Sequence, residues 1–516
     1  MTDTKQELGS VSAGLEELRA RIARGSDEAR PEAVARRRKK GFRTAQENLA
    51  DLLDDSAPFV EYGAMAVAAQ RQRRDYEELQ RETPADGVIT GIGSINSQYF
   101  DEAAARTAVV MYDYSVLAGT QGFFHHAKID RILHVAARQK LPVVMYTEGG
   151  GGRPGDTDVT TQIAGLNVST FAVWSSLNTG FPRIVVNNGY CFAGNAALFG
   201  AGDIRIATKS SSIGMAGPAM IEGGGLGKFH PDEIGPSQTQ WMNGVVDVLV
   251  DDEAAATAMA RRLLWYFQGD VDAGPVPDQT PLRDALPEDR RWSYPVRDIV
   301  ERLFDTGSFT ELRRPFGRSV ITGLARLGGR AVGVLASDCQ QLGGAVDSEA
   351  SDKASRFFKL CRRTGLPVIS LVDTPGFMVG PASEESAAVH RMSQLFEEAS
   401  TASVPILAVF LRKAYGLGAM ALVGGSFAVP DFACAWPTGE FGGMGLEGAV
   451  RLGFRKELEA ETDPDKRQAL FDHLLGQLYD KGKALEAAAH LEIDAVIDPA
   501  DTRAQLLAAL QCHRQG

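Results

Sequence analysis

The most restrictive feature of the sequence is a long segment that occurs twice. Lys128 and Arg131 recur as Lys353 and Arg356, and Leu-Pro-Val-Val at 141–144 recurs as Leu-Pro-Val-Ile at 366–369, all at one constant spacing. Other matches keep the same order with small shifts, as loop insertions would produce: 88–91 with 320–323, Pro182 with Pro405, Gly194 with Gly418, and Leu53, Phe59 and Glu61 with Leu303, Phe309 and Glu311. The repeat predicts two copies of one architecture.

Each copy alternates apolar strands with helices. In the first copy, a strand over 107–112 precedes a helix over 124–139 and a strand over 142–146. Strands without polar alternation are buried on both faces, so the pattern predicts an α/β fold in which helices cover a sheet. The first 50 residues predict an appended helical arm, in which Leu15, Leu18 and Ile22 serve packing.

The stretch 269–293 is rich in Pro and Asp and indicates a domain boundary. We place this boundary between residues 288 and 289. The sequence therefore predicts an N-terminal domain over 1–288, including the helical arm, and a C-terminal domain over 289–516.

The formal net charge of −12 disfavours nucleic acid and anionic membranes as main partners, because both require a basic surface. The basic run 36–43 (RRRKKGFR) is interpreted as a solvated helix face, with contact to an anionic ligand or a targeting signal as alternatives. No apolar stretch resembles a signal peptide or a membrane span, so we expect a soluble, cytoplasmic protein.

Metal chemistry has little support in the sequence. The five cysteines are scattered, without a Cys-x-x-Cys pair or a histidine at ligand spacing, which predicts reduced thiols and no zinc site. His125 and His126 are adjacent on a predicted helix and point about 100° apart, so we interpret them, like the isolated His230, as structural. Four carboxylates show no pairing that would indicate acid/base catalysis and are interpreted as structural or substrate-positioning: Glu148, Glu222, Glu440 and Glu447.

Each copy has small residues directly after a buried strand. Gly194 and Asn195 follow the strand at 183–186, and Gly418 and Ala419 follow the strand at 406–410. Small residues that open a helix leave unpaired N–H groups at its N-terminus, which can hold an oxyanion. Each such donor contributes about 3–4 kcal/mol to transition-state stabilisation. Close helix-to-sheet packing is the alternative, but recurrence in both copies favours two oxyanion sites.

Other active-site patterns are missing. The glycine run 149–152 lacks the Lys and Ser/Thr of a phosphate-binding loop, and we identify no G-x-G-x-x-G motif that opens a strand–helix unit with an acidic residue beyond it, as a dinucleotide site requires. No G-x-S-x-G nucleophile elbow is present either. Nucleotide binding and serine hydrolysis are therefore disfavoured.

From about residue 48 onward the chain resembles the carboxyltransferase (beta) subunits of biotin-dependent acyl-CoA carboxylases, such as those for acetyl-, propionyl- and methylcrotonyl-CoA. The motifs that carry the resemblance are 187–198 (NNGYCFAGNAAL), 216–222 (AGPAMIE), 244–247 (GVVD), 373–380 (DTPGFMVG) and 436–446 (WPTGEFGGMGL). The resemblance implies two crotonase-like (ββα superhelix) domains and a homo-hexamer. It also implies an active site between the N-domain of one subunit and the C-domain of another.

The resemblance further implies that backbone amides form both oxyanion holes. Gly194 and Asn195 would hold the thioester oxygen, and Gly418 and Ala419 the ureido oxygen of biotin. CoA-side residues would be Ala193, Gly150, Gly151, Ala216 and Gly217, with Ala421 in the acyl pocket; biotin-side residues would be Thr374, Pro375, Gly376, Phe377, Tyr415 and Gly416. Carboxybiotin would release CO2, and its ureido nitrogen would take the α-proton of the thioester, so no side-chain base is needed.

Some residues depart from the family pattern. Asn195 stands where the family commonly has Gly, the loop 148–153 is richer in glycine than usual, and 235–240 (GPSQTQ) lacks a frequent histidine. These departures imply that the CoA end of the site differs in detail. The small Ala421 side chain would leave room for an acyl group larger than acetyl.

The sequence shows no biotin carboxylase segment and no Met-Lys-Met biotinylation site. A biotin carboxylase and a biotin carboxyl carrier are therefore expected as partners, with acyl-CoA as substrate and no metal on this chain. Alternatives are a biotin-dependent carboxyacyl-CoA decarboxylase subunit, an inactive scaffold subunit, and a CoA-thioester hydratase or isomerase. The sequence does not define the acyl group or the direction of the reaction.

Overall fold

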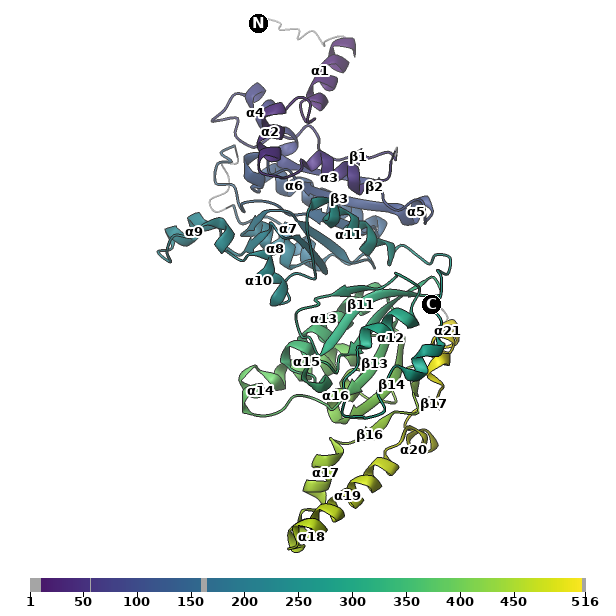
Figure 1. The fold of residues 1–516 in the computed structure, drawn as a ribbon. Coiled ribbons are helices and arrows are strands. Elements are labelled where there is room, and N and C mark those ends of the chain that lie inside the picture. The colour runs from purple at the N-terminus through teal and green to yellow at the C-terminus, as the bar shows by residue number, and fades with distance from the viewer. Residues whose placement is uncertain (1–10, 56, 159–164, 513–516) are drawn as a thin grey trace, which may run out of the picture. The chain divides into compact units, whose positions relative to one another are not determined.

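A computed structural model describes residues 11–55, 57–158 and 165–512, which form two compact units (Figure 1). One unit consists of the chain up to Trp241 together with Leu249–Gln268, and the other of Met242–Val248 together with the chain from Gly269 onward. The functional domain boundary between residues 288 and 289 stays a prediction.

Among the described residues, the first unit contains a seven-stranded sheet in the order β1-β2-β3-β4-β5-β7-β9. Strands β1, β2 and β3 pair in antiparallel fashion, whereas β3, β4, β5 and β7 run parallel. The strands are β1 (Val60–Glu61), β2 (Val88–Ser94), β3 (Arg106–Tyr112), β4 (Val143–Tyr146), β5 (Arg183–Asn187), β7 (Ile204–Thr208) and β9 (Val248–Val250). A smaller sheet pairs β6 (Tyr190–Phe192) with β8 (Ser212–Gly214).

The sheet of the second unit repeats this arrangement. Its order is β10-β11-β12-β13-β14-β15-β17, with β16 paired to β14. Here too the first three strands are antiparallel and the next are parallel. The strands are β10 (Thr310–Leu312), β11 (Val320–Leu327), β12 (Arg330–Ser337), β13 (Val368–Thr374), β14 (Ile406–Tyr415), β15 (Phe432–Ala435), β16 (Glu440–Gly442) and β17 (Ala495–Val496).

A helix follows the antiparallel strand pair in both units. These helices are α6 (Phe123–Gln139) and α13 (Ser348–Thr364), each of 17 residues. Each ends on a left-handed residue, Lys140 with φ 53° and Gly365 with φ 67°, and these two positions have the same spacing along the chain as Lys128 and Lys353. The predicted α/β fold and the predicted repeat of strand, helix and strand are thus confirmed, by β3-α6-β4 in the first unit and β12-α13-β13 in the second.

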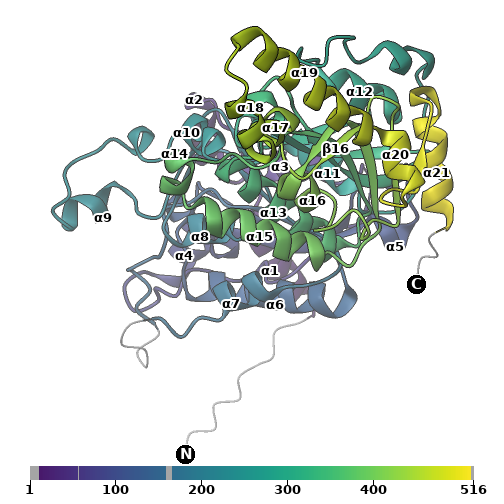
Figure 2. The same ribbon diagram turned by 90° about the horizontal axis from the view of Figure 1, so that it is seen from below.

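Helices cover both faces of the second sheet. The first face packs against α12 (Val296–Leu303) and α21 (Thr502–Cys512) in one apolar cluster with β13 and β14. On the other face, α13 packs beside α15 (Ala388–Ser400), as Figures 1 and 2 both show. Apolar residues at successive strand positions therefore have cover on either side, which explains the near-continuous apolar runs of these strands.

The remaining helices are shorter or lie at the edges of the units. They are α4 (Tyr76–Glu82), α5 (Glu102–Ala105), α7 (Thr170–Ser176), α8 (Gly194–Gly200), α9 (Pro218–Gly223), α10 (Ser237–Met242), α11 (Glu253–Trp265), α14 (Pro381–Glu385), α16 (Gly416–Ala421), α17 (Leu446–Gly453), α18 (Arg455–Ala460), α19 (Pro464–Lys481) and α20 (Ala484–Ala489). Short 3-10 turns are η1 (Pro84–Gly87), η2 (Leu117–Gly119), η3 (Pro231–Glu233), η4 (Thr280–Asp284), η5 (Leu342–Gly344) and η6 (Pro499–Asp501).

The predicted N-terminal arm consists of α1 (Val11–Ala23), α2 (Pro31–Lys39) and α3 (Ala45–Leu52). A capping box between Thr44 and Glu47 starts α3, which packs on α11. The packing role expected for the apolar residues of α1 was wrong within the described chain, because Leu15, Leu18 and Ile22 are 44–56% exposed. No helix in the described parts of the chain is long and apolar enough to cross a membrane.

Candidate functional site

In the first unit, the small residues predicted to hold an oxyanion, Gly194 and Asn195, lie at the start of α8. We call this turn from strand to helix the glycine step. Ala193 precedes the helix with φ 52° and ψ −119°, a conformation that few non-glycine residues adopt. The sharp bend brings Gly194 and Asn195 into the first helical turn, where N–H groups have no intrahelical acceptor. Within the described residues, neither amide donates a hydrogen bond to the protein. Gly194 is only partly buried, so its amide lies where a ligand can approach.

In the second unit, the corresponding step lies at the start of α16. Gly416 has φ 58°, a left-handed conformation suited to glycine, and Gly418 and Ala419 are buried in the following turn. A side chain at Gly418 would meet the backbone of Gly376 and Phe377 at 2.6–2.8 Å. The absence of a side chain at Gly418 therefore brings α16 against the loop that follows β13.

The contacts around the two steps show which positions correspond. The amide of Gln121 donates to Gly151 O in the first unit, and the amide of Val346 donates to Gly376 O in the second. Gly151 packs against Ala193 as Gly376 packs against Gly418. Gly418 therefore corresponds to Ala193, at the constant spacing of the repeat, and Ala419 rather than Gly418 corresponds to Gly194.

Several other predicted site residues have amides that are already engaged. The amide of Gly150 donates to Ala118 O, that of Ala193 to Gly214 O, and that of Gly151 to Asn195 Oδ1. In the second unit, the amide of Gly376 donates to Thr374 Oγ1 at 3.1 Å. A substrate could meet these residues only through their other atoms, whereas the first-turn amides of α8 remain available.

The Asn195 side chain has a role that the sequence did not reveal. It is fully buried; its Oδ1 accepts from Gly151 N at 2.9 Å, and its Nδ2 donates to Thr147 O at 3.1 Å and to Gly119 O at 3.3 Å. One side chain therefore connects α8 to the loop after β4 and to η2. The departure from glycine at this position was the available signal.

The remaining predicted substrate-binding residues belong to different units. Ala216 and Gly217 precede α9 and are partly exposed, and Gly217 faces the buried ring of Phe192, which directly precedes Ala193. Ala421, predicted in the acyl pocket, lies in α16 and has no exposed surface.

The predicted biotin-side residues surround the start of α16. Thr374 and Gly376 are buried, Pro375 is exposed, and Phe377 is partly buried. Tyr415 donates its hydroxyl hydrogen to Glu440 Oε2 at 2.8 Å. Burial and the neighbouring Glu440 carboxylate raise the pKa of Tyr415 above its ordinary value, so the phenol stays protonated at neutral pH.

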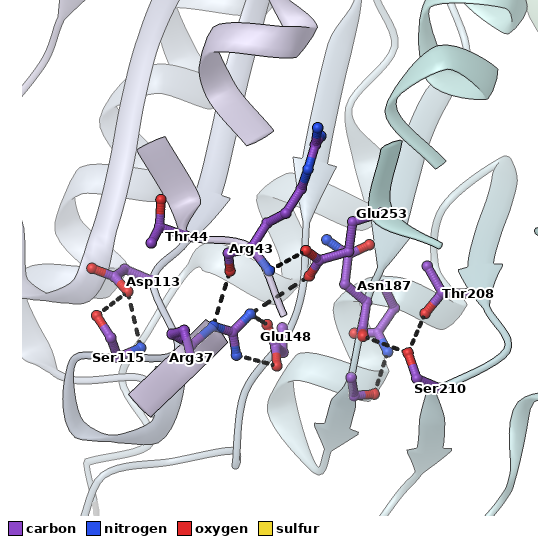
Figure 3. A network of polar contacts seen from close by, with 12 residues as sticks. Arg37, Arg43, Thr44, Asp113, Ser115, Glu148, Asn187, Thr208, Ser210 and Glu253 are labelled. Atoms are coloured by element: carbon purple, nitrogen blue, oxygen red, sulfur yellow. Dashed lines mark hydrogen bonds and ion pairs between the residues drawn. The ribbon is translucent and has the colours of Figure 1, made fainter. Parts of the chain in front are cut away.

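The carboxylates left open by the sequence have protein partners. Glu440 is held by Tyr415 and by Arg290, Glu447 accepts from Tyr479, and the exposed Glu222 pairs with Lys228. Glu148 is buried beside the glycine loop and accepts two hydrogen bonds of 2.8 Å from Arg37 (Figure 3). The interpretation of 36–43 as a solvated face was therefore wrong for Arg37, which is 8% exposed.

The histidines and cysteines do not form a metal site in the described part of the chain. His125 Nδ1 contacts Asp86 O, whereas His126 Nδ1 contacts Thr170 Oγ1, in line with separate structural roles. His230 Nδ1 accepts from the amide of Asp232. All five cysteines are free, and the described residues include no group of three potential metal ligands.

The motif at 244–247 holds the second unit together. Asp247 pairs with the buried Arg313, and Gly244 lies against the ring of Phe316 with φ 77°. Gly244 O also accepts from Arg356 Nη2 at 2.8 Å. This motif therefore makes structural contacts within the second unit.

Comparison of this chain with known proteins identifies its family. Residues 36–516 match the model of the carboxyl transferase domain. The methylmalonyl-CoA carboxyltransferase 12S subunit of Propionibacterium freudenreichii subsp. shermanii is 30% identical over 97% of this chain and 93% of that protein.

Solved structures agree with the sequence match. A single-chain, multi-domain long-chain acyl-CoA carboxylase is 51% identical with a TM-score of 0.89 over 96% of this chain, and this chain spans 49% of that one. The transcarboxylase 12S structure, described as a hexamer assembly, is 28% identical with a TM-score of 0.85 over 98% of this chain and 97% of that one. The chain therefore belongs to the carboxyl transferase domain family, as its motifs indicated.

Proposed function

We propose that this chain transfers a carboxyl group between carboxybiotin on a carrier and the α carbon of an acyl-CoA. The first turn of α8, at Gly194 and Asn195, holds the thioester oxygen, and the first turn of α16, at Gly418 and Ala419, holds the ureido oxygen. The observation that carries the proposal is the recurrence of the strand–turn–helix step in both units, where Ala419 occupies the position of Gly194 at the constant spacing of the repeat.

Backbone donors suit this chemistry because both substrates develop negative charge on a carbonyl oxygen. Each preorganised donor contributes about 3–4 kcal/mol when it points at that oxygen. Nearby side chains are poor bases. Burial raises the pKa of Cys191 to about 12, and the Tyr415 phenol is likewise protonated at neutral pH. The chain then binds and orients the two substrates and stabilises the negative charge on their carbonyl oxygens, while the proton moves between the substrates.

The acyl group is proposed to be a long chain. This extends to the present chain what is named for the single-chain relative of 51% identity. A groove of about 550 Å³ beside α16 is lined by the apolar Met420, Phe427 and Phe441 and by the polar Lys481, Glu486, His490 and Glu492. Its size falls within the roughly 300–1,000 Å³ of ligand sites. Rates measured with acyl-CoAs from two to sixteen carbons should rise with chain length, and a strict preference for acetyl-CoA would reject this substrate class.

The other activities of the complete reaction are proposed to come from partner chains. The single-chain relative is about twice as long as the part that matches here, and the biotin carboxylase and biotin carrier expected from the sequence would correspond to its remainder. A homo-hexamer is proposed from the transcarboxylase 12S assembly, and a cytoplasmic location from the sequence. Sedimentation and cell fractionation test these two points.

The assay for the activity is the reverse reaction. The protein is incubated with a panel of carboxyacyl-CoAs and free biotin, and loss of the carboxyl group is followed. Loss that requires biotin supports carboxyl transfer, whereas turnover of an enoyl-CoA without biotin would indicate a hydratase or isomerase. Comparing forward and reverse rates with a charged carrier then separates carboxylase from decarboxylase function.

The oxyanion donors require a test that leaves side chains unchanged. Gly418→Pro is unsuitable, because any Cβ at this position collides with Gly376. Replacing Ala419 with lactic acid converts its amide to an ester and removes only the N–H. We expect a 100-fold to 1,000-fold loss of kcat, as removal of one oxyanion donor typically causes. The matched control is the same ester at Leu417, whose amide has no assigned role; equal losses in both would refute the assignment.

A further inference from the structure

Each unit has a buried carboxylate at the end of a parallel strand, just before the loop that packs against α8 or α16. We call these two loops, which follow Glu148 in the first unit and Thr374 in the second, the glycine loops. Glu148 follows β4, and Asp373 is the penultimate residue of β13. The two positions have the constant spacing of the repeat and thus correspond to each other. Both are buried, at 7% and 0% exposure.

In each unit an arginine from a different element neutralises this carboxylate. Arg37, from α2 of the arm, binds both oxygens of Glu148 at 2.8 Å and donates from Nε to Arg43 O (Figure 3). Arg412, from β14, binds Asp373 at 2.9 Å through Nη2 and also through Nε. Its Nη1 donates to Arg290 O and Trp292 O. The two units therefore have a carboxylate at the same position of the repeat, but its arginine comes from a different element in each unit.

The backbone of each carboxylate is fixed as well. A side chain at Gly119 would meet Glu148 O at 2.3 Å, and a side chain at the corresponding Gly344 would meet Asp373 O at 2.4 Å. The loop beyond then pairs with Gln121 in the first unit and with Val346 in the second. Each loop therefore starts from a point that is held by charge on one side and by close backbone contact on the other.

We propose that Arg37–Glu148 and Arg412–Asp373 are positioning pairs, the first for the acyl-CoA oxyanion turn and the second for the biotin oxyanion turn. The inference rests on the proposed function for the identity of the two turns. A buried carboxylate cannot leave its arginine without a large desolvation cost, so each pair fixes the loop that packs against α8 or α16. A displacement of about 1 Å at a reacting group can cost about 100-fold in rate.

The chain offers matched control pairs that are also buried but lie away from the glycine loops. In the first unit Arg183 binds Asp203 at 2.8 Å, with side chains 9% and 14% exposed. In the second unit Arg503 binds Asp305, with side chains 6% and 4% exposed. A purely structural effect of breaking a buried ion pair should be similar for the positioning pairs and these controls.

The test uses the full-length protein and biotin-dependent decarboxylation of a carboxyacyl-CoA. Glu148→Gln should change kcat or KM for the carboxyacyl-CoA at least tenfold and leave KM for biotin within twofold. Asp373→Asn should change kcat or the KM for biotin at least tenfold and leave the KM for the carboxyacyl-CoA within twofold. Asp203→Asn and Asp305→Asn should leave both KM values within twofold, once rates are corrected for the folded fraction from thermal unfolding. Glu148→Asp, which restores the charge, should recover part of the loss.

Two results would overturn the inference. One is that Glu148→Gln and Asp373→Asn affect the same substrate; the other is that they alter activity only as much as their control pairs do. If Glu148→Gln does not fold, Arg37→Lys provides the same measurement with the charge retained. Failure of the proposed function is distinguishable, because the unsubstituted protein would then show no biotin-dependent decarboxylation. Failure of the oxyanion assignment would leave the Ala419 ester with full activity.

Discussion

Truncation of Asn195 tests whether a single side chain assembles the first oxyanion turn. Asn195→Ala removes the hydrogen bonds to Gly151, Thr147 and Gly119, which join three separate segments. We expect the first turn of α8 to survive, because its own backbone bonds remain. The loop after β4, however, should lose its direct connection to that turn.

The size of the effect follows from the bonds lost. A buried hydrogen bond contributes about 1 kcal/mol net, and each polar partner left without a bond in the interior adds to the cost. Three such bonds give about 2–4 kcal/mol. In a unit of this size, each kcal/mol lowers Tm by about 2–4 °C, so the first unit should unfold roughly 4–16 °C earlier.

Differential scanning calorimetry can follow the unfolding of each unit. The control is Asn48→Ala in the same unit, because Asn48 is 3% exposed and its Oδ1 has no hydrogen-bond partner among the described residues. This control should cost less than about 1 kcal/mol, since no bond to that oxygen is lost. In the biotin-dependent assay, Asn195→Ala should also raise KM for the carboxyacyl-CoA more than KM for biotin.

A loss below about 1 kcal/mol for Asn195→Ala, equal to that of Asn48→Ala, would refute the connecting role of the side chain. A large loss of stability with unchanged kinetic constants in the folded fraction would keep the structural role and reject the effect on the site.

Further predictions concern buried charges. Lys353 is fully buried, and its Nζ has no hydrogen-bond partner among the described residues. Burial lowers the pKa of Lys353 to about 7. The corresponding Lys128, in contrast, donates hydrogen bonds to Ala85 O and Val88 O. Lys353→Met should therefore raise the free energy of unfolding at pH 7 and flatten its rise between pH 7 and 10, while Lys128→Met should lower it, as denaturant titrations will show. Burial raises the pKa of Glu253 from 4.5 to about 7, so the folded state holds an extra proton in this range and stability falls as pH rises from about 4.5 to 7. Glu253→Gln should remove this dependence, up to about 1.4 kcal/mol per pH unit, and a parallel pH profile for both proteins would contradict it.

The sequence alone determined the architecture, because the repeat and the unbroken apolar strands leave few ways to bury such segments. The offset between Lys128 and Lys353 already located α6 and α13, and the small residues after β5 and β14 located both helix starts. These signals are local in sequence, since strand burial and helix initiation depend on neighbouring residues.

Tertiary structure decided which groups are free and which are engaged. The amides of Gly150 and Gly151 are already bonded, and Asn195 acts through its side chain as well as its position. Arg37 lies in a basic run that resembles a solvated surface, yet it neutralises Glu148 from 111 residues away. Partners so distant leave no periodic pattern in the sequence, because their pairing depends on the three-dimensional path of the chain and on the cost of burying a charge alone.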